Sequence, residues 1–157
     1  MDWLAYPIQL EWIRHLQALG GPFVDALMGY AHYLDSQAIY VLVISSMWVW
    51  CKPQVALLPT LAMAANVAVN HTLKHLLGQP RPFVLDSGVA LAPLLDPTLV
   101  NGLPSGGAQT AMLMAGLLVF HCRRPWAFAF ALVYPLFVGL SRIYLGVHFL
   151  QMWRLGM

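Results

Sequence analysis

The sequence predicts an all-α integral membrane helical bundle, with about four full spans, amphipathic N-terminal helices and a short final helix. The 157 residues are 60% hydrophobic and only 9% charged, whereas an ordinary soluble domain carries about 25% charged residues. The mean hydropathy is +0.68, and the apolar residues gather in long runs. We expect one domain, residues 1–157, in which 1–34 form interfacial helices and 35–157 form a bundle that carries the functional motifs.

The N-terminal 34 residues mix apolar and ionisable side chains, and a Gly20-Gly21-Pro22 break divides them. Neither half is a clean membrane span, so we expect two amphipathic helices at the membrane interface. His32 is interpreted as an interfacial residue only. A cleaved signal peptide is not expected, because the basic start and the cleavage site are missing.

Four apolar runs follow, and each is long enough to suggest a span. Tryptophan and lysine at the end of the first run are typical of a membrane interface. The second run carries one polar stripe at four-residue spacing, Asn66, Asn70 and Lys74, which should face the bundle interior. The expected spans are approximately Gln37–Trp50, Pro53–Leu77, Ser105–Phe120 and Trp126–Leu140.

Orientation follows from the positions of the basic residues. Lys52, Arg123 and Arg124 all fall in turns on one side of the bundle, which the positive-inside rule assigns to the cytoplasm. The long Pro- and Gly-rich loop from Gly78 to Pro104 then lies outside, and we expect it to be functional. We therefore predict a multi-pass protein of a cell membrane, most simply a bacterial inner membrane, with its site facing the periplasm or exterior.

The chain after His148 is too short to cross a bilayer. Nine residues rise about 13.5 Å as a helix, against a hydrocarbon core of about 30 Å. The final segment therefore ends in the outer leaflet, belongs to something longer, or is completed by homo-oligomerisation, and these alternatives stay open.

A candidate anion site lies where Pro104-Ser105-Gly106-Gly107 runs into the third apolar segment. A helix start leaves backbone N–H groups unpaired at the positive end of the helix dipole. A plain helix start with Ser105 as N-cap is the alternative interpretation. Lys74, Arg81 and Arg142 are expected on the same side of the membrane, and together these groups suit a tetrahedral oxyanion such as phosphate. His148 supplies a nucleophile of suitable pKa.

These motifs resemble the type 2 phosphatidic acid phosphatase superfamily, which includes undecaprenyl-diphosphate phosphatases and vanadium haloperoxidases. Its first motif, a lysine, six residues and Arg-Pro, matches Lys74 to Arg81-Pro82. Its second, Pro-Ser-Gly-His, matches Pro104-Ser105-Gly106. Its third, Ser-Arg, five residues, a histidine, three residues and an aspartate, matches Ser141-Arg142 and His148. The resemblance implies that Lys74, Arg81, Ser105, Gly106 and Arg142 bind phosphate, while His148 forms a phosphohistidine.

Two family positions lack the expected residue. Gly107 stands where the resemblance places the histidine that protonates the leaving group, and Met152 stands where it places the aspartate that orients the nucleophile. His71 and His75 are the predicted substitute acids. A substitute orienter for His148 could come only from Asp86, Asp96 or the N-terminal region. Loss of a general acid typically costs about 10²- to 10⁴-fold in rate.

The predicted function is hydrolysis of a lipid phosphate or isoprenoid diphosphate at the outer face, through a phosphohistidine. A diphosphate is favoured, since its leaving group departs with little need of a proton. The alternative is an impaired pseudophosphatase that binds anionic lipid headgroups. A vanadate-dependent peroxidase is disfavoured because those relatives are soluble. No cofactor is expected, no metal cluster stands out, and the few charges indicate no nucleic-acid partner; the expected partners are the lipid substrate and the bilayer.

Overall fold

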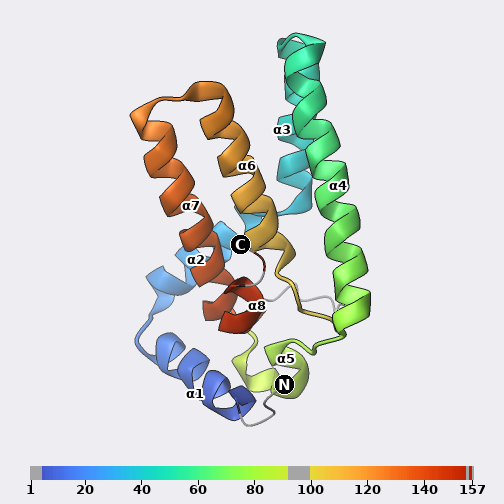
Figure 1. The fold of residues 1–157 in the computed structure, drawn as a ribbon. Coiled ribbons are helices and arrows are strands. Elements are labelled where there is room, and N and C mark those ends of the chain that lie inside the picture. Colours follow the sequence, from blue (N-terminus) through green and yellow to red (C-terminus); the bar gives the residue numbers. More distant parts are fainter. Residues whose placement is uncertain (1–4, 92–99, 155, 157) are drawn as a thin grey trace.

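A computed structural model describes residues 5–91, 100–154 and 156, and these residues form helices and loops without a strand. Figure 1 shows α3, α4, α6 and α7 side by side, with α1, α5 and α8 gathered at one end of the bundle. The helices are α1 (Ala5–Ala18), α2 (Pro22–Leu34), α3 (Gln37–Trp50), α4 (Pro53–Leu77), α5 (Pro82–Leu85), the 3-10 helix η1 (Ser87–Val89), α6 (Gly106–Cys122), α7 (Pro125–Tyr144) and α8 (Leu150–Arg154).

Local chemistry sets several helix boundaries. α2, α4, α5 and α7 each begin with proline, whose fixed φ suits the first helical turn and whose missing N–H costs nothing there. α4 ends at Gly78, which adopts a left-handed conformation with φ of 52°. α6 begins after Ser105, whose hydroxyl accepts a hydrogen bond from the N–H of Ala108. The N-cap interpretation of Ser105 therefore holds for its local geometry.

The four long helices differ in length. α4 and α7, with 25 and 20 residues, are long and apolar enough to span a membrane. α3 has 14 residues and α6 has 17, which correspond to about 21 and 25 Å of helix at about 1.5 Å per residue. Two of the four predicted spans are thus long enough to cross a hydrocarbon core, and the other two are shorter apolar helices.

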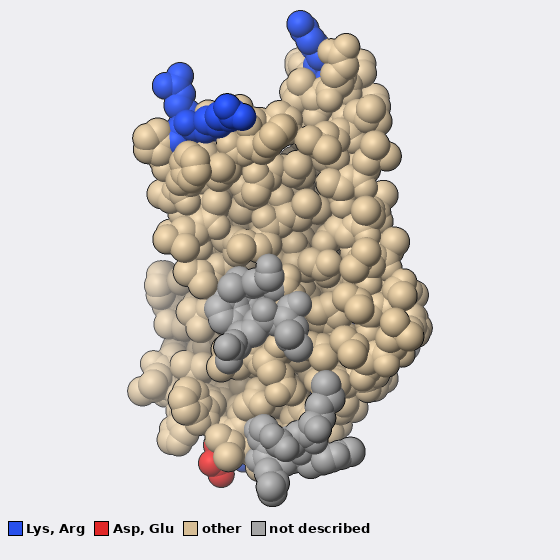
Figure 2. All heavy atoms as spheres, viewed as in Figure 1, with Lys and Arg blue, Asp and Glu red and all other residues tan. Residues whose placement is uncertain are grey.

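The surface of the bundle fits a membrane. Figure 2 shows basic side chains at the α3–α4 and α6–α7 turns and a broad band without charge below them. Large apolar side chains on the long helices are exposed, among them Leu61 at 59% and Leu132 at 68%. Such a band is far larger than the apolar patches of soluble monomers and marks a membrane-facing surface. The predicted integral membrane helical bundle is therefore confirmed.

The densest packing lies at the end of the bundle opposite those basic turns. Ile13 of α1 joins a buried cluster with Phe149 and Met152, and Met28 of α2 joins a second cluster with Tyr144. The amphipathic N-terminal helices thus place their apolar faces against the protein. Their buried side chains help hold the C-terminal end of α7 in place.

The long loop returns to its own start. The N–H of Arg81 donates to the carbonyl of Val100 at 3.1 Å, and the N–H of Gly102 donates to that of Gln79 at 2.7 Å. These bonds, with the isolated antiparallel bridge Pro80–Asn101, hold Arg81 next to the start of α6. Asp96, one of the candidate orienters, lies outside the described residues.

Candidate active site

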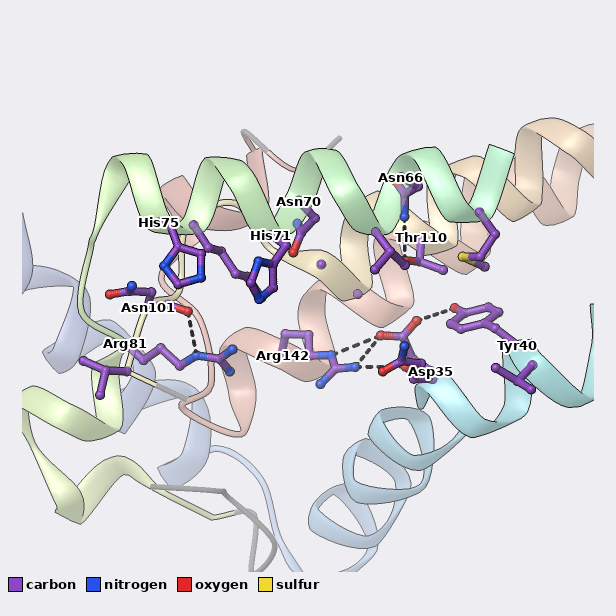
Figure 3. Close-up of a pocket in the computed structure, with 18 residues that line it drawn as sticks. Asp35, Tyr40, Asn66, Asn70, His71, His75, Arg81, Asn101, Thr110 and Arg142 are labelled. Carbon is purple, nitrogen blue, oxygen red and sulfur yellow. Dashed lines mark hydrogen bonds and ion pairs between the residues drawn. The ribbon is translucent and has the colours of Figure 1, made fainter. Parts of the chain in front are cut away.

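A pocket of about 540 Å³ opens between α3, α4, α6 and α7. Four of the predicted phosphate-binding residues line it, Lys74, Arg81, Gly106 and Arg142. Figure 3 shows the Arg81 side chain pointing toward Arg142 beneath His71 and His75 of α4, while the guanidinium of Arg142 points toward Asp35. The structure thus brings residues from three separate motifs to one wall of one cavity.

Arg81 is held by the loop but keeps donors free. Its Nε donates to the carbonyl oxygen of Asn101 at 3.3 Å, and its two terminal amino groups have no hydrogen-bond acceptor among the described residues. Burial, and next the positive charge of Arg142, lower the pKa of Arg81 to about 10. This guanidinium still carries its charge at neutral pH, and the shift shows that the pocket is short of negative charge. A bound anion would relieve that repulsion.

Arg142 is already paired inside the protein. Its Nε donates to Oδ2 of Asp35 at 3.2 Å, and its Nη2 forms an ion pair with the same oxygen. The side chain of Asp35 is fully buried and that of Arg142 is 12% exposed. Tyr40 donates its hydroxyl to Oδ1 of Asp35. The carboxylate of Asp35 therefore lines the pocket with one oxygen paired to Arg142 and the other accepting a hydrogen bond from Tyr40.

His32 also contacts Arg142, which corrects the expectation that it is merely interfacial. Nδ1 of His32 lies 2.7 Å from Nη1 of Arg142. Burial, followed by the charges of Arg142 and Arg81, lowers the pKa of His32 to about 4. A neutral His32 can accept this hydrogen bond at neutral pH, so α2 helps to orient Arg142.

The start of α6 supplies backbone donors. Ser105 accepts from the N–H of Ala108 through its side chain and from that of Gln109 through its carbonyl. The N–H groups of Gly106 and Gly107 have no acceptor among the described residues, and both glycines line the pocket. Ser105 itself is fully buried and does not line it. Its role in phosphate binding stays a prediction.

His148 is buried within reach of the charges of the pocket cations Lys74, Arg81 and Arg142. It is 3% exposed and is not among the lining residues. Burial lowers the pKa of His148 well below its ordinary value, and the charges of Arg81, Arg142 and Lys74 lower it further. The ring has a backbone hydrogen bond with Gly102, while its Nδ1 has no partner in the described part of the chain. His148 is therefore a neutral imidazole held beside three cations.

No described carboxylate orients His148. Met152 is fully buried in an apolar cluster and provides no oxygen ligand. Asp86 pairs with Arg14, and Asp35 pairs with Arg142. Of the candidate substitutes for the orienting aspartate, Asp86 and Asp35 are thus engaged elsewhere, and Asp96 lies outside the described residues.

The predicted substitute acids lie on α4. His71 and His75 both line the pocket, and their ring centroids are 4.5 Å apart. Both side chains are exposed. The sequence analysis did not single out Asp35 or Tyr40 as site residues. The one available signal was the position of Asp35, directly before the first apolar run.

The fold and the site together define an α-helical membrane protein with a cationic pocket, and a family model makes the assignment specific. The model of the PAP2 superfamily matches residues 55–151, a range that includes all three motifs. The chain therefore belongs to the PAP2 superfamily, as its motifs indicated.

Individual relatives agree with this assignment. The chain is 30% identical over 115 residues to a protein of Escherichia coli (strain K12) named "Putative undecaprenyl-diphosphatase YbjG", covering 71% of this chain and 54% of that protein. It thus spans about half the length of that curated relative. The crystal structure of Aquifex aeolicus LpxE is similar with a TM-score of 0.76 and 25% identity, over 94% of this chain and 86% of that one. A transmembrane PAP2 type phosphatidylglycerolphosphate phosphatase from Bacillus subtilis shares the fold with a TM-score of 0.77 and 23% identity, over 99% and 80% of the two chains.

Proposed function

We propose that this protein hydrolyses a lipid phosphate or isoprenoid diphosphate through a phosphohistidine at His148. The observation that carries the proposal is the convergence of Lys74, Arg81 and Arg142 on one pocket, in front of a neutral histidine. Positive charge with free donors is what a phosphoryl group in transfer requires.

Binding uses the cations and the start of α6. Arg81 offers its two free amino groups and Lys74 its ammonium group, while Gly106 and Gly107 offer backbone N–H groups at the positive end of the α6 dipole. Arg142 contributes charge through a guanidinium that Asp35 and His32 already orient. The phosphoryl group would lie among these five residues.

The pocket also has an apolar part that suits a lipid chain. Val41 of α3 and Met63 and Val67 of α4 line it together with the cations. A lipid could thus place its headgroup at the charged end while its chain runs between α3 and α4 toward the bilayer. The same geometry supports the membrane as a partner of the protein.

His148 attacks as a neutral imidazole, forming a P–N bond while the P–O bond to the leaving group breaks. Water then attacks the phosphohistidine and releases phosphate. Because His148 is 3% exposed, the phosphorus would approach it from the pocket that Lys74, Arg81 and Arg142 line. The site lies at the end of the bundle opposite Lys52, Arg123 and Arg124, which supports an outward-facing site under the positive-inside rule.

A second candidate function is lipid binding without turnover. Two observations favour it: Asp35 already pairs with Arg142, and Nδ1 of His148 has no partner among the described residues. A pseudophosphatase of this kind would hold an anionic headgroup through Arg81 and Lys74 and leave it intact.

The deciding experiment follows phosphate release from a ³²P-labelled isoprenoid diphosphate by the purified protein in detergent. We expect release, and an acid-labile phosphoprotein that is absent from His148→Ala. His121→Ala is the matched control, because His121 lies at the far end of α6. If neither release nor labelling occurs while the lipid binds in an Arg81-dependent manner, the binding function replaces the enzymatic one.

A further inference from the structure

We propose that Asp35 is the proton donor to the leaving group, acting from α3's start in the space that Gly107 leaves open. The role rests on the proposed hydrolysis. It concerns a residue that lies outside all three motifs, 69 positions or more from two of them, and that reaches the pocket through the packing of α2 against α7 (Figure 3).

The carboxylate occupies the space beside Gly107. A Cβ atom on Gly107 would overlap Oδ2 of Asp35 and would lie 2.9 Å from Nε and 3.0 Å from Nη2 of Arg142. No side chain at position 107 can coexist with the carboxylate in this arrangement. A donor at the start of α6 is thus replaced, in the same space, by one that enters from the other side of the pocket.

The position suits a proton donor. Asp35 lines the pocket beside Gly106 and Gly107, whose N–H groups are the proposed ligands of the phosphoryl group. Tyr40 and Arg142 hold the two carboxylate oxygens in fixed directions. His71 and His75 are exposed and contact each other, so they have neither the burial nor the anchoring of Asp35.

The substrate brings the proton to Asp35. In the free protein, Oδ2 of Asp35 is paired with the guanidinium of Arg142. A phosphoryl group bound among the same cations places a second negative charge nearby, and two adjacent anions in a buried site do not both stay ionised. The complex therefore retains one proton, carried by a phosphate monoanion or taken from water, and the carboxyl group holds it.

The reaction then balances over two steps. As His148 nitrogen bonds to phosphorus, the P–O bond to the leaving group breaks and that oxygen takes the proton from Asp35. In the second step, the Asp35 carboxylate accepts a proton from water as the water oxygen bonds to phosphorus. The P–N bond breaks, and His148 returns to the neutral state.

The test compares two leaving groups with Asp35→Asn, which keeps the shape and removes the proton. An alkyl phosphate releases an alkoxide whose conjugate acid has a pKa near that of water, about 15.7, whereas a diphosphate releases a phosphate ester with a pKa of about 6. Dodecyl phosphate and farnesyl diphosphate serve as the substrates. We expect kcat on dodecyl phosphate to fall about 10²- to 10⁴-fold, and kcat on farnesyl diphosphate to fall less than about tenfold.

Asp25→Asn is the matched control, because Asp25 accepts a hydrogen bond from Tyr144 in the same region and does not line the pocket. It should leave both rates within about twofold. Equal losses on both substrates in Asp35→Asn would overturn the proposal and make Asp35 only a partner that positions Arg142. A wild-type protein without activity on either substrate would instead contradict the proposed hydrolysis, and this role with it.

A second pair of variants guards against a misfolded Asp35→Asn protein. Gly107→His should lower activity on dodecyl phosphate, because its Cβ overlaps Asp35. The double variant Gly107→His with Asp35→Ala should be at least tenfold more active on dodecyl phosphate than Gly107→His alone. If the double variant is no more active on dodecyl phosphate than Asp35→Ala, a side chain at position 107 does not take over the space and the proton-donor role of Asp35.

Discussion

The ion pair between Asp35 and Arg142 provides the sharpest test of the site geometry. Both side chains are nearly sealed from solvent, at 0% and 12% exposure, and removing one partner of such a pair costs about 3–5 kcal/mol because the other charge stays buried. For a chain of this size, each kcal/mol shifts the unfolding midpoint by roughly 2–4 °C. Asp35→Ala should therefore lower the midpoint by about 6–20 °C.

The double variant separates the pair from the individual side chains. Arg142→Met alone should also destabilise strongly, because Asp35 would remain charged in a buried site. Asp35→Ala combined with Arg142→Met should cost less than the sum of the two single changes, by about 2 kcal/mol or more, since no buried charge is left unpaired. Thermal unfolding in detergent, followed by tryptophan fluorescence, measures all four proteins.

Inorganic phosphate adds a second measurement on the same proteins. Asp35→Ala leaves Lys74, Arg81 and Arg142 without a compensating anion, so phosphate should recover part of the lost stability. At 100 times its dissociation constant, a ligand of the folded state adds about 2.7 kcal/mol. Two results together would refute the reasoning. The first is that the destabilisations of the two single variants add up to that of the double variant within about 0.5 kcal/mol. The second is that phosphate gives no stabilisation specific to Asp35→Ala.

Three further predictions concern residues other than this ion pair. Burial lowers the pKa of His148 well below 6.5, so the imidazole stays neutral to a pH below that value. The acid limb of kcat/KM should therefore lie below pH 6.5. A limb at 6.5 or above would contradict the burial of His148. Ser105→Ala removes the N-cap bond to Ala108 and should lower the unfolding free energy by about 1 kcal/mol, measured by thermal unfolding. Ser46→Ala is the control, because Ser46 is an exposed serine within α3 that caps no helix. Arg14→Ala breaks an ion pair whose arginine is 60% exposed, and should change the midpoint by no more than about 2 °C because exposed pairs contribute little.

Composition and motif spacing were enough to predict the class of fold and the family. An apolar chain must satisfy its backbone hydrogen bonds within itself, so long apolar runs in a membrane become helices. The spacing from Lys74 to Arg81 and from Arg142 to His148 is local, and it carried the family resemblance that the PAP2 match to residues 55–151 confirms. The length of each span was less predictable, since α3 and α6 are shorter apolar helices than a full crossing requires.

Only the tertiary structure decided what surrounds the motif residues. Asp35 and His32 reach Arg142 across 107 and 110 positions of sequence, and no local pattern encodes a contact of that separation. It depends on how α2 and the start of α3 pack against α7. The sequence alone presented Gly107 as a lost proton donor. The packing shows that the missing side chain leaves room for a carboxylate from elsewhere in the chain, because two groups cannot occupy one volume.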